Sequence, residues 1–129
     1  MSKQKESKVD YRTIGAFLEE RVRRFGSDAP IYYGDLAAHF AMPPVTGAWF
    51  THPLCAIFGE IDVEDVRLGQ PFRTVLVISK ERNMPGEGFF KAYLDLNPHV
   101  RVPKTDNDKM KLFVGELNNV LAYYGKTAH

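Results

Sequence analysis

The sequence has a single cysteine, Cys55, no long apolar run and almost no net charge. One cysteine cannot form an internal disulfide, which is usual in a reducing compartment. No apolar run approaches the roughly 18 residues that a membrane span requires. The basic start of the chain, residues 1–12, has no apolar segment behind it and so is not a secretory signal. We therefore expect a cytoplasmic protein with no membrane partner.

The net charge of +1 conceals an uneven distribution along the chain. Residues 1–25 carry seven Lys and Arg against four Asp and Glu, residues 26–70 carry one against six, and residues 71–129 carry nine against six. Residues 43–66 contain no Lys or Arg at all. A near-neutral total argues against a strong non-specific nucleic-acid binder, so the basic groups must gather on one surface to matter.

The totals indicate one ordinary globular domain rather than a disordered chain. The sequence has 129 residues, of which 44% are hydrophobic and 26% charged, and that length favours a single domain. The polar first residues predict a flexible leader over residues 1–9, followed by a domain over residues 10–129. No repeat or low-complexity segment interrupts it.

Apolar residues at helical spacing predict four helices. The first covers residues 10–25 and ends at Gly26. A short second helix lies within residues 31–44, and a third covers residues 52–66. A terminal helix follows the apolar stripe of residues 110–124.

The segment between the third and terminal helices carries the β signal. Residues 72–79, "FRTVLVIS", are β-branched and apolar on both faces, which predicts a buried strand. Residues 88–96, "GFFKAYLDL", return as a second strand or a short helix. Three helices, a strand, a turn and a second strand give the order of a winged helix-turn-helix, an α+β fold with three helices, a β-hairpin wing and a C-terminal helix.

The turn "KERNMPGEG" at residues 80–88 has three interpretations. A phosphate-binding loop requires a fuller glycine pattern followed by Lys-Ser or Lys-Thr, and only Gly86-Glu87-Gly88 is present. A wing with Lys80 and Arg82 at its tip fits better, because such cations contact phosphates or enter a minor groove. An ordinary solvated turn is the third interpretation.

Two motifs carry a family resemblance. "YYGDLAAHFAMPP", followed by a helix, and then "QPFRTVLVIS" with "GEGF" resemble the winged-helix DNA-binding domain of O6-alkylguanine alkyltransferases and alkyltransferase-like proteins, over residues 31–90. The resemblance implies double-stranded DNA as the partner. Pro71-Phe72-Arg73-Thr74 stands where the family has Pro-Cys-His-Arg, so the acceptor cysteine and its histidine are replaced. We therefore expect neither alkyl transfer nor another enzymatic activity, and no cofactor; an aromatic residue at the cysteine position is similar to the alkyltransferase-like branch.

These patterns predict a non-enzymatic winged-helix domain, of bacterial or phage type, that binds DNA or regulates a DNA-associated process. The third helix is expected to present its N-terminal end to DNA, because its other end has acidic residues at positions 60, 62, 64 and 65 that would repel phosphate. The residues expected to bind nucleic acid are Thr51, His52, Arg73, Lys80, Arg82 and Asn83.

Other functions stay open on the sequence. A protein-interaction module or homodimer would use the acidic third helix and the C-terminal helix. A small enzyme would place His52 and Cys55 near the Gly86 loop. A zinc site is not expected, because these two residues lack two further ligands. Trp49, with Phe50 and Phe58, could stack on bases, although aromatics beside a helix are more typical of a core.

Overall fold

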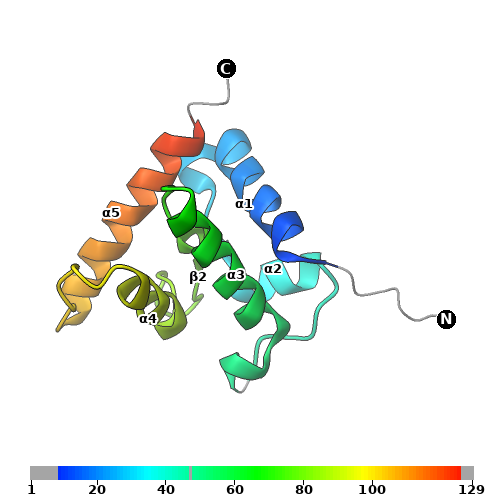
Figure 1. The fold of residues 1–129 in the computed structure, drawn as a ribbon. Helices are drawn as coiled ribbons and strands as arrows, with labels where there is room; N and C mark the ends of the chain where they lie inside the picture. The colour runs from blue at the N-terminus through cyan, green and yellow to red at the C-terminus, as the bar shows by residue number, and fades with distance from the viewer. Residues whose placement is uncertain (1–8, 47, 126–129) are drawn as a thin grey trace.

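The computed structural model describes residues 9–46 and 48–125, which form five α-helices and one two-stranded parallel sheet (Figure 1). The fold is therefore of mixed α and β composition, with helices dominant. In chain order the elements are α1 (Tyr11–Phe25), the 3-10 turn η2 (Gly26–Asp28), β1 (Ile31–Tyr32), α2 (Tyr33–His39), η3 (Trp49–Thr51), α3 (Pro53–Arg67), η4 (Arg73–Leu76), β2 (Val77–Ile78), α4 (Glu87–Leu96) and α5 (Asp106–Gly125).

The predicted first and third helices are confirmed almost to the residue by α1 and α3. Asp10 caps α1 by accepting a hydrogen bond from the Thr13 amide at 3.0 Å, and Gly26 ends it with φ of 55°. The terminal helix is also confirmed, but it begins at Asp106, earlier than its apolar stripe. Its first turn is polar, so apolar spacing alone could not find that turn.

The core surrounds the segment of residues 72–78, all of which are buried. Helices α1, α3 and α5 all pack against η4, while α4 packs against α3 (Figure 1). The fully buried side chains include Ile14, Leu18, Leu36, Leu54, Ile61, Val75, Leu76, Val77 and Val120. A segment covered on all sides needs no alternation of apolar and polar residues, which explains the continuous apolar sequence of residues 75–78.

The prediction of a strand over residues 72–79 is wrong except for β2. Residues 73–76 form the 3-10 turn η4, and β2 pairs in parallel with β1, aligning Ile31 with Val77 and Tyr32 with Ile78. The pairing joins the start of α2 to the end of the central segment.

The predicted β-hairpin wing is also wrong, because its second arm is helix α4. Of the two alternatives for residues 88–96, the helix holds. Phe89 and Phe90 are buried, and Tyr93 and Leu96 follow at helical spacing on the same partly buried side. Gly86 precedes the helix as its N-cap. No antiparallel hairpin occurs in the described part of the chain.

Arg73 was expected to contact nucleic acid, and this expectation is wrong. Its side chain is 4% exposed and lies in the core. Its guanidinium group donates to Glu19 and Glu64 at 2.7 Å and to Asp65 at 2.9 Å. These carboxylates come from α1 and α3, so Arg73 ties the central segment to both helices. A Cβ on Gly15 of α1 would lie 2.5 Å from Arg73 Nη1, so the arginine fills the space that this glycine leaves.

The acidic end of α3 faces inward more than the sequence predicted. Asp62 and Asp65 are 2% and 0% exposed, so neither faces a partner. Thr74 donates its hydroxyl to Asp62 Oδ1 at 2.6 Å. Burial raises the pKa of Asp62 to about 7, against the hydrogen bond from Thr74, which lowers it. The expected acidic surface is therefore reduced to Glu60 and a partly exposed Glu64.

Candidate functional site

A cleft opens where the two parallel strands end. β1 runs directly into α2, and β2 runs into the residue 79–86 turn that precedes α4. Because the strands are parallel, their carboxyl ends lie at one edge, where ligands bind in many α/β proteins. The cleft there has a volume of about 620 Å³. It is lined by Tyr32, Tyr33, Gly34, Asp35, Val45, Trp49, Ser79, Lys80, Glu81, Gly86, Glu87 and Gly88.

Two aromatic residues and two glycines form one wall of the cleft. The rings of Tyr33 and Trp49 meet edge to face, with centroids 5.3 Å apart. The Gly86 amide donates to the Tyr33 hydroxyl at 3.0 Å. A Cβ on Gly88 would lie 2.9 Å from Trp49 Nε1, so glycine at this position lets the indole pack against the start of α4. Burial raises the pKa of Tyr33, which keeps its hydroxyl protonated.

The "PGEG" stretch is therefore neither a hairpin tip nor a phosphate cradle. It is the entry to α4, and the Gly86 amide is already engaged by Tyr33. A phosphate loop would present that amide to its ligand. The glycines serve instead to bring α4 close to the aromatic wall.

A compact turn over residues 79–84 forms the other side of the cleft. The Ser79 amide donates to the Met84 carbonyl at 2.8 Å, and the Asn83 amide donates to the Ser79 carbonyl at 2.7 Å. Asn83 has a φ of 55°, a conformation that asparagine tolerates. Met84 is buried and anchors the turn to the core. The exposed residues 80–83 are thus held in a fixed position.

The structure brings three of the predicted site residues together on this turn: Lys80, Arg82 and Asn83. The Lys80 ammonium group lies 5.8 Å from the centroid of the Tyr32 ring, within the range of a cation–π contact. The Tyr32 hydroxyl donates to Asn83 Oδ1 at 3.4 Å. Arg82 pairs with Asp106 at 2.9 Å, but both groups are largely exposed.

The carboxylates around the cleft partly offset Lys80. Glu87 accepts from Lys109 Nζ at 2.7 Å, so its charge is paired on the side of α5. Asp35 lies near Arg21, with which it also lines a neighbouring cleft. Glu81 remains beside Lys80 at the exposed rim. The cleft is therefore close to neutral, and an anionic ligand would depend on Lys80 and Arg82.

His52 was expected to contact nucleic acid, and this expectation is wrong. It is 7% exposed and caps α3: its Nδ1 accepts from the Leu54 amide at 3.1 Å. Its Nε2 must then carry the proton, which it donates to the Pro43 carbonyl at 2.8 Å. With both nitrogens engaged, His52 cannot activate Cys55 as a base. Thr51 is exposed, but its hydroxyl donates to the Ala48 carbonyl at 2.8 Å.

The sequence reasoning missed the aromatic wall. Trp49 and Phe50 were recognised as possible base-stacking residues but interpreted as core; Phe50 is 79% exposed and Trp49 is partly exposed in the cleft. On the sequence alone, Tyr32 and Tyr33 indicate only the start of the short second helix. The two tyrosines are adjacent, one on each side of a strand-to-helix junction, and this pairing is the sequence feature that could have indicated the aromatic wall.

Two features are absent from the residues that the structure describes. No group of three or more His, Cys, Asp or Glu side chains is arranged to hold a metal ion. No helix in this part of the chain has the length and apolar character needed to cross a membrane.

Comparisons of the chain with protein-family models, with curated proteins and with solved structures find no match.

Proposed function

We propose that this chain is a non-enzymatic nucleic-acid-binding domain that holds single-stranded or frayed DNA in the cleft between the residue 79–84 turn and Trp49. The observation that carries the proposal is the placement of Tyr32, Tyr33 and Trp49 in one cleft with the cation of Lys80. Aromatic side chains stack on bases whatever their sequence, and a nearby cation meets the phosphate.

The dimensions and energies suit this ligand. A cleft of about 620 Å³ lies within the range of about 300–1,000 Å³ that is usual for small-ligand sites. Stacking of one base on an aromatic side chain contributes about 1–3 kcal/mol. Lys80 and Arg82 add two phosphate contacts, so we expect a weak complex that depends on salt.

A single strand suits the cleft better than a duplex does. Bases in a duplex are stacked on one another and cannot reach an aromatic wall without unpairing. Helix α3 offers Arg67 as its one cation, at the end away from Thr51. Helices α1–α3 still follow the order of the helical part of a winged-helix domain, and in this proposal the residue 79–84 turn takes the place of the wing.

The test is the binding of a fluorescently labelled oligothymidylate of about ten nucleotides, followed by anisotropy over a series of salt concentrations. Two phosphate contacts predict a slope of about −1.4 for log K against log salt, and Lys80→Glu should reduce its magnitude by about 0.7 while weakening binding. Lys111→Glu makes the same charge change at an exposed position on α5 that lines no described cleft. Equal binding by these two variants would exclude the cleft as the site.

A second candidate is the binding of a protein partner or of a second copy of the chain. It is favoured by apolar side chains exposed on two helices: Val63 and Val66 on α3, and Val114 and Tyr123 on α5. Association measured by sedimentation should be lost in Val66→Lys and retained in Val102→Lys, which changes an exposed valine in the loop before α5. If the chain is monomeric at all concentrations, self-association is excluded and the partner must be a different protein.

A further inference from the structure

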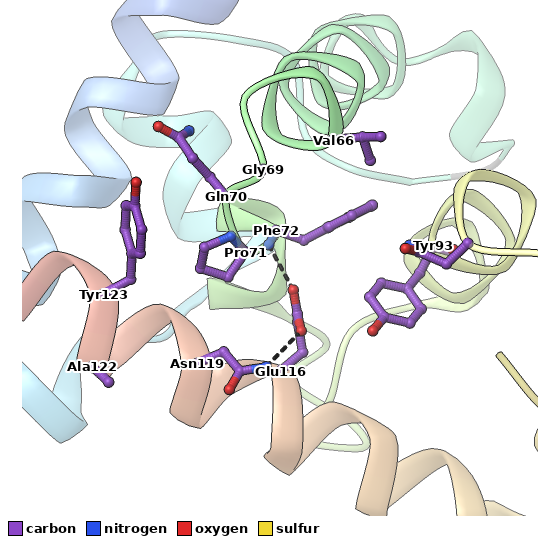
Figure 2. A pocket seen from close by; sticks show the side chains of 11 residues that line it. Val66, Gly69, Gln70, Pro71, Phe72, Tyr93, Glu116, Asn119, Ala122 and Tyr123 are labelled. Carbon is purple, nitrogen blue, oxygen red and sulfur yellow. Dashed lines mark hydrogen bonds between the residues drawn. The ribbon is translucent and has the colours of Figure 1, made fainter. Parts of the chain in front are cut away.

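A second cleft lies at the other end of α4, between α3, α4 and α5 (Figure 2). Its volume is about 480 Å³. Val66 and Gly69 border it at the end of α3, Tyr93 at the end of α4, and Tyr123 in the last turn of α5. Figure 2 shows Glu116 in the middle of the lining, below Phe72 and beside Asn119.

The ends of three helices give this cleft a negative potential. The C-terminal turns of α3, α4 and α5 all border it, and a helix carries partial negative charge at its C-terminus. Neither α4 nor α5 has a basic residue in its last turn. Arg67, in the last turn of α3, pairs with Glu64, and no Lys or Arg is among the lining residues. The first cleft, at the N-terminus of α4, differs in that Lys80 is among its lining residues and its charges are close to balanced.

Glu116 adds a full carboxylate to this potential. It is 7% exposed, and its oxygens accept from the Phe72 amide at 2.7 Å and from Asn119 Nδ2 at 3.1 Å. No Lys or Arg of the described residues forms an ion pair with it. A nearly buried carboxylate that is hydrogen-bonded but not paired with a cation favours a positively charged neighbour.

Three amide side chains line the cleft with their nitrogens already engaged. In each, the nitrogen donates within the protein: Gln70 to Asp65 at 3.0 Å, Asn97 to the Tyr93 carbonyl at 2.9 Å, and Asn119 to Glu116 at 3.1 Å. These bonds fix which amide atom is oxygen, and no donor from the described residues meets the three oxygens. These oxygens are therefore open to donors from a ligand or from solvent.

We propose that this cleft binds the arginine side chain of a partner protein. A guanidinium group carries five N–H donors in one plane and a permanent positive charge, and it stacks on aromatic rings. The cleft offers the complementary set: amide oxygens, the Glu116 carboxylate, and the rings of Tyr93 and Tyr123. Burial raises the pKa of Tyr93, with a further increase from the Glu116 charge, so its hydroxyl stays neutral.

This proposal names the chemistry of the partner for the second candidate function and rests on that candidate. It is independent of nucleic-acid binding, because the two clefts share no lining residue. A single helix, α4, would then connect a site for an anion to a site for a cation.

The test is a nuclear magnetic resonance titration of the labelled full chain with the blocked peptide Gly-Ser-Arg-Ser-Gly. We expect amide shifts at Gly69, Gln70 and Asn97, and none from the same peptide with citrulline, which keeps the shape of arginine without its charge. Asn119→Lys should weaken binding about tenfold or more, because it places a cation at the cleft. Asn118→Lys makes the same change at the neighbouring exposed position, outside the cleft, and should bind as the unmodified chain does.

The outcomes separate the possibilities. Equal shifts with citrulline, shifts outside the cleft, or equal binding by the two lysine variants would overturn the proposal. Blocked argininamide alone should bind more weakly than the peptide, because it lacks the flanking backbone; equal affinity would indicate a site for a small cation and overturn the assignment to a partner protein. If self-association depends on Val66 while the arginine peptide fails to bind, the second candidate function stands and this inference falls.

Discussion

Replacing Asp62 by asparagine should stabilise the fold at high pH and leave it unchanged at low pH. Asp62 is 2% exposed, and burial raises its pKa from the ordinary 3.8 to about 7. Because the folded-state pKa is above the unfolded one, the unfolded chain ionises first as the pH rises. Stability is therefore lost between about pH 4 and pH 7 and stays low above that range.

The size of the effect follows from the pKa values. A rise from 3.8 to about 7 corresponds, at about 1.4 kcal/mol per pH unit, to about 4 kcal/mol. Asparagine removes the charge and keeps an oxygen that accepts from Thr74, as Asp62 Oδ1 does at 2.6 Å. The charged neighbours, Asp65 and Arg73, remain in both chains, so the difference between variant and parent isolates Asp62.

Urea unfolding followed by circular dichroism provides the assay. The gain in unfolding free energy for Asp62→Asn should approach about 4 kcal/mol at about pH 8.5 and fall toward zero at about pH 4. Asp95→Asn removes an exposed carboxylate paired with Lys91 and should change stability by less than about 1 kcal/mol at either pH. A gain for Asp62→Asn that does not depend on pH, or a loss at high pH, would refute the reasoning.

Two further substitutions test other parts of the structure. Arg73→Ala should cost about 3–5 kcal/mol in urea unfolding, because it leaves buried carboxylates without their cation, whereas Arg67→Ala at an exposed ion pair should cost less than about 1 kcal/mol. Gly88→Ala should displace the Trp49 indole, shift its fluorescence and weaken oligonucleotide binding, since the new Cβ would lie 2.9 Å from Nε1. Gly59→Ala adds a methyl group where nothing lies within 4 Å and should leave both unchanged or stabilise the helix.

The helices could be predicted because their signals are local. Asp10 and Gly26 mark the two ends of α1 by chemistry that acts within one turn. The α5 stripe buries Phe113 and Val120 at helical spacing. In each of these cases the sequence pattern and the tertiary packing favour the same structure.

The backbone conformation of residues 72–78 could not be predicted, because a fully buried segment shows no periodic pattern of polar residues. Residues 72–78 are mainly apolar, and a buried strand and a buried 3-10 turn both accept such a sequence. The parallel partner of β2 is β1, more than forty positions earlier, and no local signal specifies that pairing. The prediction of a wing followed from assigning this segment to a hairpin.

The roles of charged residues were equally hidden. From the sequence, Arg73 is expected to be an exposed cation. In the structure, carboxylates from α1 and α3 surround it. His52 reads as an exposed residue at a helix start, yet its ring caps α3. Lys80, Arg82 and Asn83 lie on one turn because they are close together in the sequence; their contact with nucleic acid stays a prediction.

The central claim, that a base stacks against the aromatic wall, is tested most directly by the fluorescence of Trp49, the one tryptophan in the chain. Titration with an oligothymidylate of about ten nucleotides at low salt should quench its emission, while an abasic oligomer of the same length and charge should not. No change with either oligomer, or equal quenching by both, would contradict the account.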